Sequence, residues 1–175
     1  MKIILVRHGQ TDWNLKKLMQ GRTDIPLNET GRVQALEVKE QLKNEKIDIC
    51  FSSPLSRTMT TAKIITDLDV IIDERLVERG VGTLEGKDSK IYKNINYYDF
   101  KSNSNKYGVE SVQDLFARAS SFLEFIKEKY PDKTILIVSH GATIRALHYV
   151  ITGYNENTNF LEKKVPNCCI LKYNI

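Results

Sequence analysis

The sequence predicts an α/β domain built on a mostly parallel sheet, and three observations support this fold class. Strand-like apolar runs alternate along the chain with segments whose apolar residues recur at helical spacing. The runs at residues 2–6 and 134–138 are almost unbroken, which is typical of parallel strands buried on both faces by helices. The length of 175 residues fits one domain with a full core, spanning residues 1–175.

The expected elements follow one another in a regular order. Strands are expected at residues 2–6, 48–51, 70–72, 134–138 and 169–173. Helices are expected after Asn28, over residues 55–67, after Ser111 and over residues 142–151. Asn28 and Ser111 are good N-terminal caps, Pro54 suits the start of a helix, and Gly153 suits its end.

The composition argues against two classes of binding partner, nucleic acids and membranes. The formal net charge is +4, but acidic residues are interleaved with the lysines, so a solvated surface is expected and no nucleic-acid partner. The apolar runs are too short to span a bilayer, so no membrane partner is expected, and residues 1–6 lack the pattern of a secretory leader. Cys50, Cys168 and Cys169 form neither a disulfide framework nor a zinc motif, which favours a cytoplasmic location.

Residues 87–108 differ in kind from the rest of the chain. They are rich in Lys, Asn, Ser and Tyr and show little periodicity. This composition predicts a short lid-like insert over a site, and a passive surface loop is an equal alternative.

Two segments share one design, namely ILVRHGQT at residues 4–11 and LIVSHGAT at residues 136–143. Each predicts a buried strand, then His-Gly, then a helix, so His8 and His140 are expected at the carboxyl ends of strands, where open α/β sheets bind ligands. Gly9 and Gly141 would let the backbone approach a ligand, and the helix amides that follow favour an anion. If the strands are neighbours, both imidazoles converge on one anion pocket.

Three more side chains are expected at the same edge. Arg57 falls in the first turn of a helix after the strand at residues 48–51, and Arg7 directly precedes His8. Two guanidinium groups match phosphate oxygens and stay charged. Glu78 follows the strand at residues 70–72 and would deliver a carboxylate. This set predicts phosphoryl transfer, with one imidazole attacking phosphorus and Glu78 protonating the leaving oxygen.

Each element also has a plainer interpretation. A single His-Gly after a strand is often structural, and the arginines and Glu78 could form ordinary ion pairs. Two histidines and a glutamate could also hold a metal, but the metal-binding spacings HxH and HExxH are missing from the sequence, and neighbouring arginines would repel a cation. His148 lies within an expected helix and is interpreted as structural.

With these residues in view, the chain resembles the histidine phosphatase superfamily, the phosphoglycerate mutase-like proteins. The resemblance covers nearly the whole chain and keeps the order of the family's motifs. Its motifs are LVRHGQTDWN at residues 5–14, GRTDIPLNETG at 21–31, SSPLSRT at 52–58 with TA at 61–62, ERGVGTLEG at 78–86, GVES at 108–111, VSHG at 138–141 and PN at 166–167.

The resemblance implies a role for each matching residue. His8 is the nucleophile that becomes phosphorylated, and Glu78 is the proton donor. The implied phosphate pocket consists of Arg7, Arg57, His140, Asn14 and the backbone of Gly141, with Gln20 and Gly21 near the substrate. The implied fold is a three-layer α/β/α sandwich with one antiparallel strand, and no metal or other cofactor is implied.

The sequence favours a phosphatase over a mutase within this family. Glycolytic mutases carry a Lys and an Arg pair after the glutamate, whereas the Lys position here holds Ser89 and no Arg occurs between Arg79 and Arg118. A short, open insert admits water, which hydrolyses the intermediate. The expected substrate is a small phosphorylated metabolite, as for broad-specificity or α-ribazole phosphatases, acted on by a monomer or homodimer. A phosphoglycerate mutase and a non-catalytic phospholigand-binding module are the alternatives.

Overall fold

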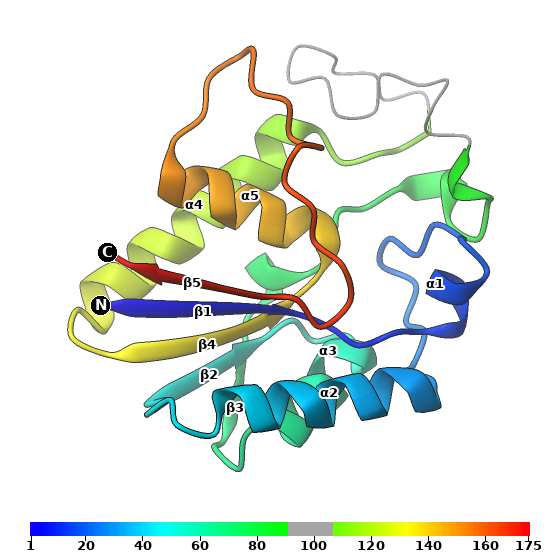
Figure 1. The fold of residues 1–175 in the computed structure, drawn as a ribbon. Coiled ribbons are helices and arrows are strands. Elements are labelled where there is room, and N and C mark those ends of the chain that lie inside the picture. The colour runs from blue at the N-terminus through cyan, green and yellow to red at the C-terminus, as the bar shows by residue number, and fades with distance from the viewer. Residues whose placement is uncertain (91–106) are drawn as a thin grey trace.

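A computed structural model describes residues 1–90 and 107–175 and shows a five-stranded mixed sheet (Figure 1). Its strands are β1 (Lys2–Arg7), β2 (Ile49–Ser52), β3 (Val70–Ile72), β4 (Thr134–Ser139) and β5 (Ile170–Asn174). The spatial order is β3-β2-β4-β1-β5, in which β5 alone runs antiparallel to its neighbour, β1. The predicted mostly parallel sheet with one antiparallel strand is therefore confirmed.

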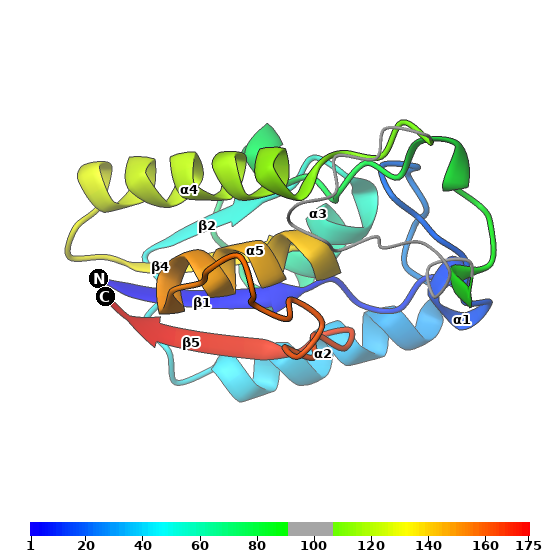
Figure 2. The same ribbon diagram turned by 90° about the horizontal axis from the view of Figure 1, so that it is seen from above.

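Helices cover both faces of the sheet. Helices α2 (Glu29–Leu42) and α3 (Ser56–Ile65) lie on one face, and α4 (Val112–Lys129) and α5 (Gly141–Thr152) lie on the other (Figures 1 and 2). Shorter elements are α1 (Asp12–Leu15) and the 3-10 turns η1 (Glu74–Leu76) and η2 (Gly82–Leu84). This arrangement is the expected three-layer α/β/α sandwich.

Alternation along the central strands divides the core in two. In β1, Ile3 and Leu5 pack with the residues of α4 and α5, whereas Ile4 and Val6 pack with those of α2 and α3. All four side chains are fully buried. A strand that is apolar on both faces needs a helical layer on each side, so the unbroken apolar runs predicted the layering correctly.

Local signals set most of the boundaries. Asn28 and Ser111 cap their helices as predicted, accepting hydrogen bonds of 2.9 Å from the amides of Gly31 and Asp114 respectively. Helix α3 is shorter than the predicted range of 55–67, because Leu55 is its N-terminal cap and Thr66 its C-terminal cap. Pro54 therefore precedes the cap and does not occupy the first helical position.

The helix expected after His8 differs from the prediction. Helix α1 has four residues and begins only at Asp12, with Thr11 as its cap. Between them the chain passes directly against α2, because a Cβ atom on Gly9 would overlap the carbonyl oxygen of Gly31. Gly9 thus allows two backbones to cross, and the ligand approach predicted for it stays a prediction.

The predicted insert at residues 87–108 falls largely on residues 91–106, which lie outside the described residues. Its first residues pair with the loop after α1, through bonds of 2.9 Å from Met19 N to Lys87 O and from Ser89 N to Lys17 O. The lid-like role stays a prediction. Across residues 1–90 and 107–175, no helix has the length and apolar character needed to cross a bilayer.

Candidate active site

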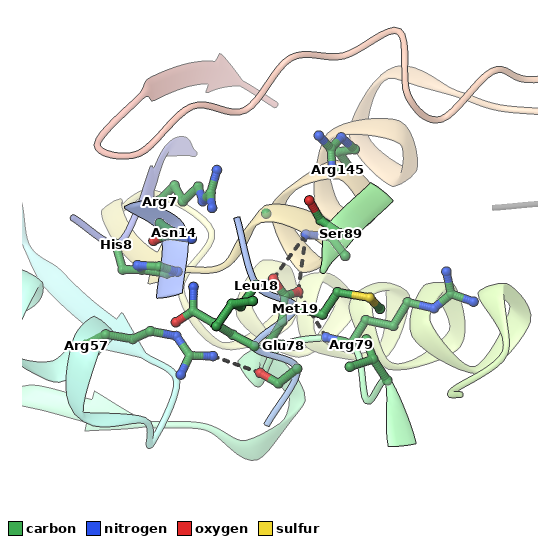
Figure 3. Close-up of a pocket in the computed structure, with 15 residues that line it drawn as sticks. Arg7, His8, Asn14, Leu18, Met19, Arg57, Glu78, Arg79, Ser89 and Arg145 are labelled. Carbon is green, nitrogen blue, oxygen red and sulfur yellow. Dashed lines mark hydrogen bonds between the residues drawn. The ribbon is translucent and has the colours of Figure 1, made fainter. Parts of the chain in front are cut away.

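A cavity of about 440 Å³ opens beyond the carboxyl ends of β1 and β4 (Figure 3). Of the nine residues proposed from the sequence, eight line it: Arg7, His8, Asn14, Gln20, Gly21, Arg57, Glu78 and Gly141. They come from distant parts of the chain, and the parallel strands bring them to one edge of the sheet. The ninth, His140, is fully buried and lies behind this lining.

His8 lines the cavity, and one of its ring nitrogens is hydrogen-bonded to the backbone. Its Nδ1 lies 2.7 Å from the carbonyl oxygen of Gly9, which can only accept, so Nδ1 carries the proton and Nε2 keeps its lone pair. Burial, followed by the charges of Arg7 and Arg57, holds the pKa of His8 well below its ordinary value. The neutral imidazole is the form that can act as a nucleophile.

Arg57 is fully buried, and all three of its guanidinium nitrogens have partners. Nε donates to His140 Nδ1 at 3.2 Å, and Nη1 and Nη2 donate to the carbonyl oxygens of Thr23 and Gly21, each at 2.8 Å. Burial lowers the pKa of Arg57 to about 10, partly offset by the nearby carboxylate of Glu78, so it stays charged at neutral pH. Each Nη group has a second N–H that a phosphate oxygen can accept.

His140 contacts both His8 and Arg57 from behind the cavity. The two imidazole rings meet edge to face, with centroids 5.2 Å apart and planes at 62°. Because His140 Nδ1 accepts from Arg57, its proton resides on Nε2, which donates to Ser53 Oγ at 2.8 Å. Burial and then the charge of Arg57 hold the pKa of His140 well below its ordinary value. The structure thus brings the two histidines together, but only His8 is open to the cavity.

Arg7 and Glu78 both lie close to the backbone of Gly141. The Nη1 of Arg7 donates to the carbonyl oxygen of Val165 at 2.7 Å, which holds the guanidinium without neutralising it. A Cβ atom on Gly141 would lie 3.7 Å from Arg7 Cζ and 3.8 Å from Glu78 Oε2. The backbone at the start of α5 therefore lies close to both the guanidinium and the carboxylate, and the ligand approach expected at Gly141 stays a prediction.

Glu78 occupies the N-terminus of α5. Its Oε1 accepts from the amide of Arg79 at 2.9 Å and from that of Ala142 at 3.1 Å (Figure 3). The helix amides after His140 were expected to favour an anion, and one of them, that of Ala142, donates to this carboxylate. An acid placed on a helix N-terminus is held in a fixed position by the unpaired N–H groups there.

Asn14 has its amide orientation fixed by three donors. Its Oδ1 accepts from the N–H and hydroxyl of Thr11, both at 3.2 Å, and from Asn167 Nδ2 at 3.1 Å. The Nδ2 of Asn14 must then be the group available to the cavity. Asn167 also donates to the carbonyl oxygens of His8 and Gly9, at 3.0 and 3.2 Å. Asn167 belongs to the PN motif at residues 166–167, but the sequence did not predict this role for it.

Further lining residues were not predicted from the sequence. They are Leu18, Met19, Arg79, Val81, Ser89, Ala142 and Arg145. The sequence could have predicted Arg145 as a lining residue. It lies four positions after Gly141, and residues at this spacing share one face of a helix. In the described part of the chain, no group of three or more His, Cys, Asp and Glu side chains is placed to hold a metal ion.

The fold and this lining of basic and histidine side chains define a class of phosphoryl-transferring enzymes that includes phosphatases and mutases. The sequence model of the histidine phosphatase superfamily (branch 1) matches residues 3–175. The chain belongs to that superfamily.

Relatives of known name agree with this assignment. The uncharacterized phosphatase PhoE of Bacillus subtilis is 40% identical over 175 residues, covering 96% of this chain and 85% of that protein. Phosphoglycerate mutase-like protein 4 of Arabidopsis thaliana is 38% identical over 160 residues, covering 84% and 69%. The crystal structure of phosphoserine phosphatase from Entamoeba histolytica, in complex with 3-phosphoglyceric acid, superposes with a TM-score of 0.85 at 34% identity, covering 98% and 89%.

Proposed function

We propose that this chain is a metal-independent phosphatase that hydrolyses small phosphomonoesters through a phosphohistidine on His8. One observation carries the proposal. The Nδ1–H of His8 is bonded to the backbone, so its Nε2 lone pair is the free ring position at a cavity that also receives Arg7 and Arg57. A neutral nucleophile beside two fixed cations is suited to attack on an anionic phosphate.

In the first step His8 Nε2 attacks phosphorus and the bond to the ester oxygen breaks. The departing oxygen takes a proton from Glu78, which we assign to Oε2 because Oε1 accepts the two shorter amide bonds. Arg7, Arg57 and the amide of Asn14 neutralise charge on the three remaining phosphoryl oxygens. The products of this step are the alcohol and a phosphohistidine.

In the second step water attacks the phosphorus of the phosphohistidine. The Glu78 carboxylate takes a proton from the water, the bond to Nε2 breaks, and inorganic phosphate leaves. His8 and Glu78 return to their starting protonation states, so the cycle uses only water and the ester. Every charge that develops is met by a residue of the chain, which is why we propose that no metal is required.

The substrate is proposed as a small phosphorylated metabolite of the cytoplasm. The relatives support a phosphatase, since one is named as a phosphatase and another as phosphoserine phosphatase. The α-ribazole phosphatase alternative belongs in the same substrate screen. We propose no part for nucleic acid or a membrane, and either a monomer or a homodimer is compatible with a cavity lined by one chain.

The direct test is release of nitrophenol and phosphate from p-nitrophenyl phosphate in excess chelator. We expect the same activity in the presence of chelator as in its absence with added Mg²⁺. Activity that is lost with chelator and restored by a divalent cation contradicts the metal-independent mechanism.

A phosphoglycerate mutase is the second candidate, because a relative from Arabidopsis thaliana carries that name. A coupled assay primed with 2,3-bisphosphoglycerate separates the two. We expect release of inorganic phosphate to exceed interconversion of 2- and 3-phosphoglycerate. Rapid interconversion with little phosphate release would reverse the ranking, and a failure of both reactions would favour the non-catalytic phospholigand-binding module.

A further inference from the structure

The segment that carries Glu78 has no regular secondary structure of its own. Residues 77–81 lie between η1 and η2 and belong to no helix or strand. A general acid has to lie within about 3 Å of the oxygen that it protonates, so the position of this segment matters to the proposed reaction. Because no ladder of backbone hydrogen bonds holds the segment, its position depends on contacts with other elements.

Two buried hydroxyl groups bind the backbone immediately before Glu78. The Oγ of Ser139 donates to the carbonyl oxygen of Leu76 at 2.8 Å, and the Oγ1 of Thr143 donates to that of Val77 at 2.7 Å. All four of these residues are buried, and the two donors are fully so. A buried carbonyl oxygen cannot turn to water when its donor is lost, so these bonds hold residues 76 and 77 more firmly than exposed bonds would.

Thr143 uses its hydroxyl differently from another threonine of the same helix. A helical threonine can return its hydroxyl to a carbonyl oxygen of the preceding turn, as Thr152 does to His148 at 2.9 Å. Thr143, in the first turn of α5, donates instead to Val77, which lies 66 residues away in the chain. The bond of Thr143 therefore connects α5 to the Glu78 segment, whereas the bond of Thr152 stays within its own helix.

Ser139 is also bonded to the backbone of the proposed nucleophile. Its carbonyl oxygen accepts from the N–H of His8 at 3.0 Å, and it is paired with Arg7 in the ladder between β1 and β4. Its hydroxyl donates to Leu76, two residues before Glu78. One residue thus connects the backbone of the nucleophile to the segment of the acid, and this connection fixes how far apart the two lie.

The same part of the chain binds the Glu78 carboxylate. The N–H of Ala142 donates to Glu78 Oε1 at 3.1 Å. Residues 139, 143 and 142, at the junction of β4 and α5, therefore bind residues 76, 77 and 78 respectively. Because one strand–helix junction holds both the backbone and the carboxylate, few positions remain for Glu78 Oε2.

We propose that Ser139 and Thr143 are positioning residues for general acid catalysis. Their hydroxyl groups hold the backbone before Glu78 so that Oε2 reaches the departing ester oxygen while His8 attacks phosphorus. This inference rests on the proposed function and deepens it. Neither residue is among the described residues that line the cavity, so each acts through Glu78 and not by contact with the substrate.

Two esters that differ in their need for a proton test this role. The alkoxide of glycerol 3-phosphate must be protonated as it leaves, whereas p-nitrophenolate leaves without a proton. Thr143→Val and Ser139→Ala should each lower kcat/KM for glycerol 3-phosphate about tenfold more than kcat/KM for p-nitrophenyl phosphate. A fall by the same factor for both esters overturns the proposal, because a variant that is merely less well folded loses both activities in proportion.

A conservative variant and a matched control locate the effect in the hydroxyl group. Thr143→Ser keeps the donor and should restore the wild-type ratio of the two kcat/KM values. Thr152→Val makes the same change in the same helix and should leave both kcat/KM values unchanged. A ratio as low in Thr143→Ser or in Thr152→Val as in Thr143→Val overturns the part assigned to the Thr143 hydroxyl.

The Glu78→Gln background shows whether the hydroxyl groups act through the acid. In that background, Thr143→Val and Ser139→Ala should cause no further fall in the ratio, because the group that they position is already missing. A further fall of about tenfold would mean that they act on another group, and overturns the proposal.

These measurements separate this inference from the proposed function. Turnover of neither ester by the wild-type chain overturns the phosphatase and this inference with it. Turnover whose ratio falls in Glu78→Gln, but in neither Thr143→Val nor Ser139→Ala, leaves the phosphatase supported and overturns this inference alone.

Discussion

Two segments with the same sequence design have different structural roles in this molecule. Both consist of a buried strand followed by His-Gly. After β1, the ring of His8 lines the cavity and Gly9 crosses the backbone of α2. After β4, the ring of His140 is enclosed and the glycine that follows lines the cavity. A His-Gly pair after a strand thus fixes a position at the sheet edge, and the surrounding contacts decide which group faces the ligand.

The partners of the two rings explain the difference. In His8, Nδ1 donates to a neighbouring carbonyl oxygen and Nε2 stays available. In His140, by contrast, both ring nitrogens form hydrogen bonds, one with Arg57 and one with Ser53. We therefore assign the phosphoryl group to His8 and assign to His140 the task of holding Arg57. The following predictions test this division, from the largest expected effect to the smallest.

Replacing His8, the proposed nucleophile, should have the largest effect. His8→Ala should lower kcat for p-nitrophenyl phosphate by about 10⁴-fold or more, because no covalent intermediate can form. His148→Ala is the matched control, since His148 lies on α5 and pairs with Tyr173 through a contact of 2.7 Å. Steady-state kinetics should show the control at wild-type activity. Comparable losses in the two variants would contradict the account.

Replacing Glu78, the proposed proton donor, should have an effect that depends on the leaving group. Glu78→Gln should lower kcat by about 10²- to 10⁴-fold for an alkyl phosphate, whose alkoxide must be protonated as it leaves. The loss should be smaller for p-nitrophenyl phosphate, because p-nitrophenolate leaves without a proton. Equal losses across a series of leaving groups would remove Glu78 from the role of acid.

Replacing the second histidine should cost less than replacing the first. His140→Gln should lower kcat by about 10²-fold, because Arg57 loses its fixed partner but keeps the carbonyl oxygens of Thr23 and Gly21. Kinetics with p-nitrophenyl phosphate and the affinity for inorganic phosphate both report on this change. A loss as large as that of His8→Ala, with unchanged phosphate affinity, would show that His140 takes a direct chemical part.

Disturbing the orientation of Asn14 should have a smaller effect. Asn167→Asp removes the donor that binds Asn14 Oδ1 and the backbone of His8, and should lower kcat/KM about tenfold. The exposed Asn174 at the end of β5 provides the control, and Asn174→Asp should leave kcat/KM unchanged. Equal activity of the two variants would show that the amide of Asn14 is oriented without Asn167.

The low pKa of the buried histidines should appear as a pH dependence of stability. Below pH 6.5 the unfolded chain protonates His8 and the native chain does not, so unfolding takes up a proton. The free energy of unfolding therefore decreases as the pH is lowered. The expected slope is about 1.4 kcal/mol per pH unit for each such histidine, down to the lowered native pKa. Urea unfolding of His8→Asn should show a slope smaller by about that amount. An unchanged slope would mean that His8 is charged in the native state.

The sequence predicted the layers, the mostly parallel sheet and eight of the fifteen residues that line the cavity, because these depend on apolar period and on the meeting of parallel strand ends. It did not predict which ring would be enclosed. The burial of His140 depends on Arg57 and Ser53, which lie more than 80 residues away in the chain. The crossing of Gly9 with Gly31 and the donation from Asn167 to His8 are likewise long-range contacts that local patterns do not encode.

Trapping the intermediate tests the central claim most directly. The wild-type chain, mixed with a labelled phosphomonoester and quenched in alkali after milliseconds, should carry one phosphoryl group per chain on the imidazole of His8, identified by peptide mass spectrometry. We expect none on His140. A label found on His140, or turnover with no phosphohistidine at any time point, would contradict the account.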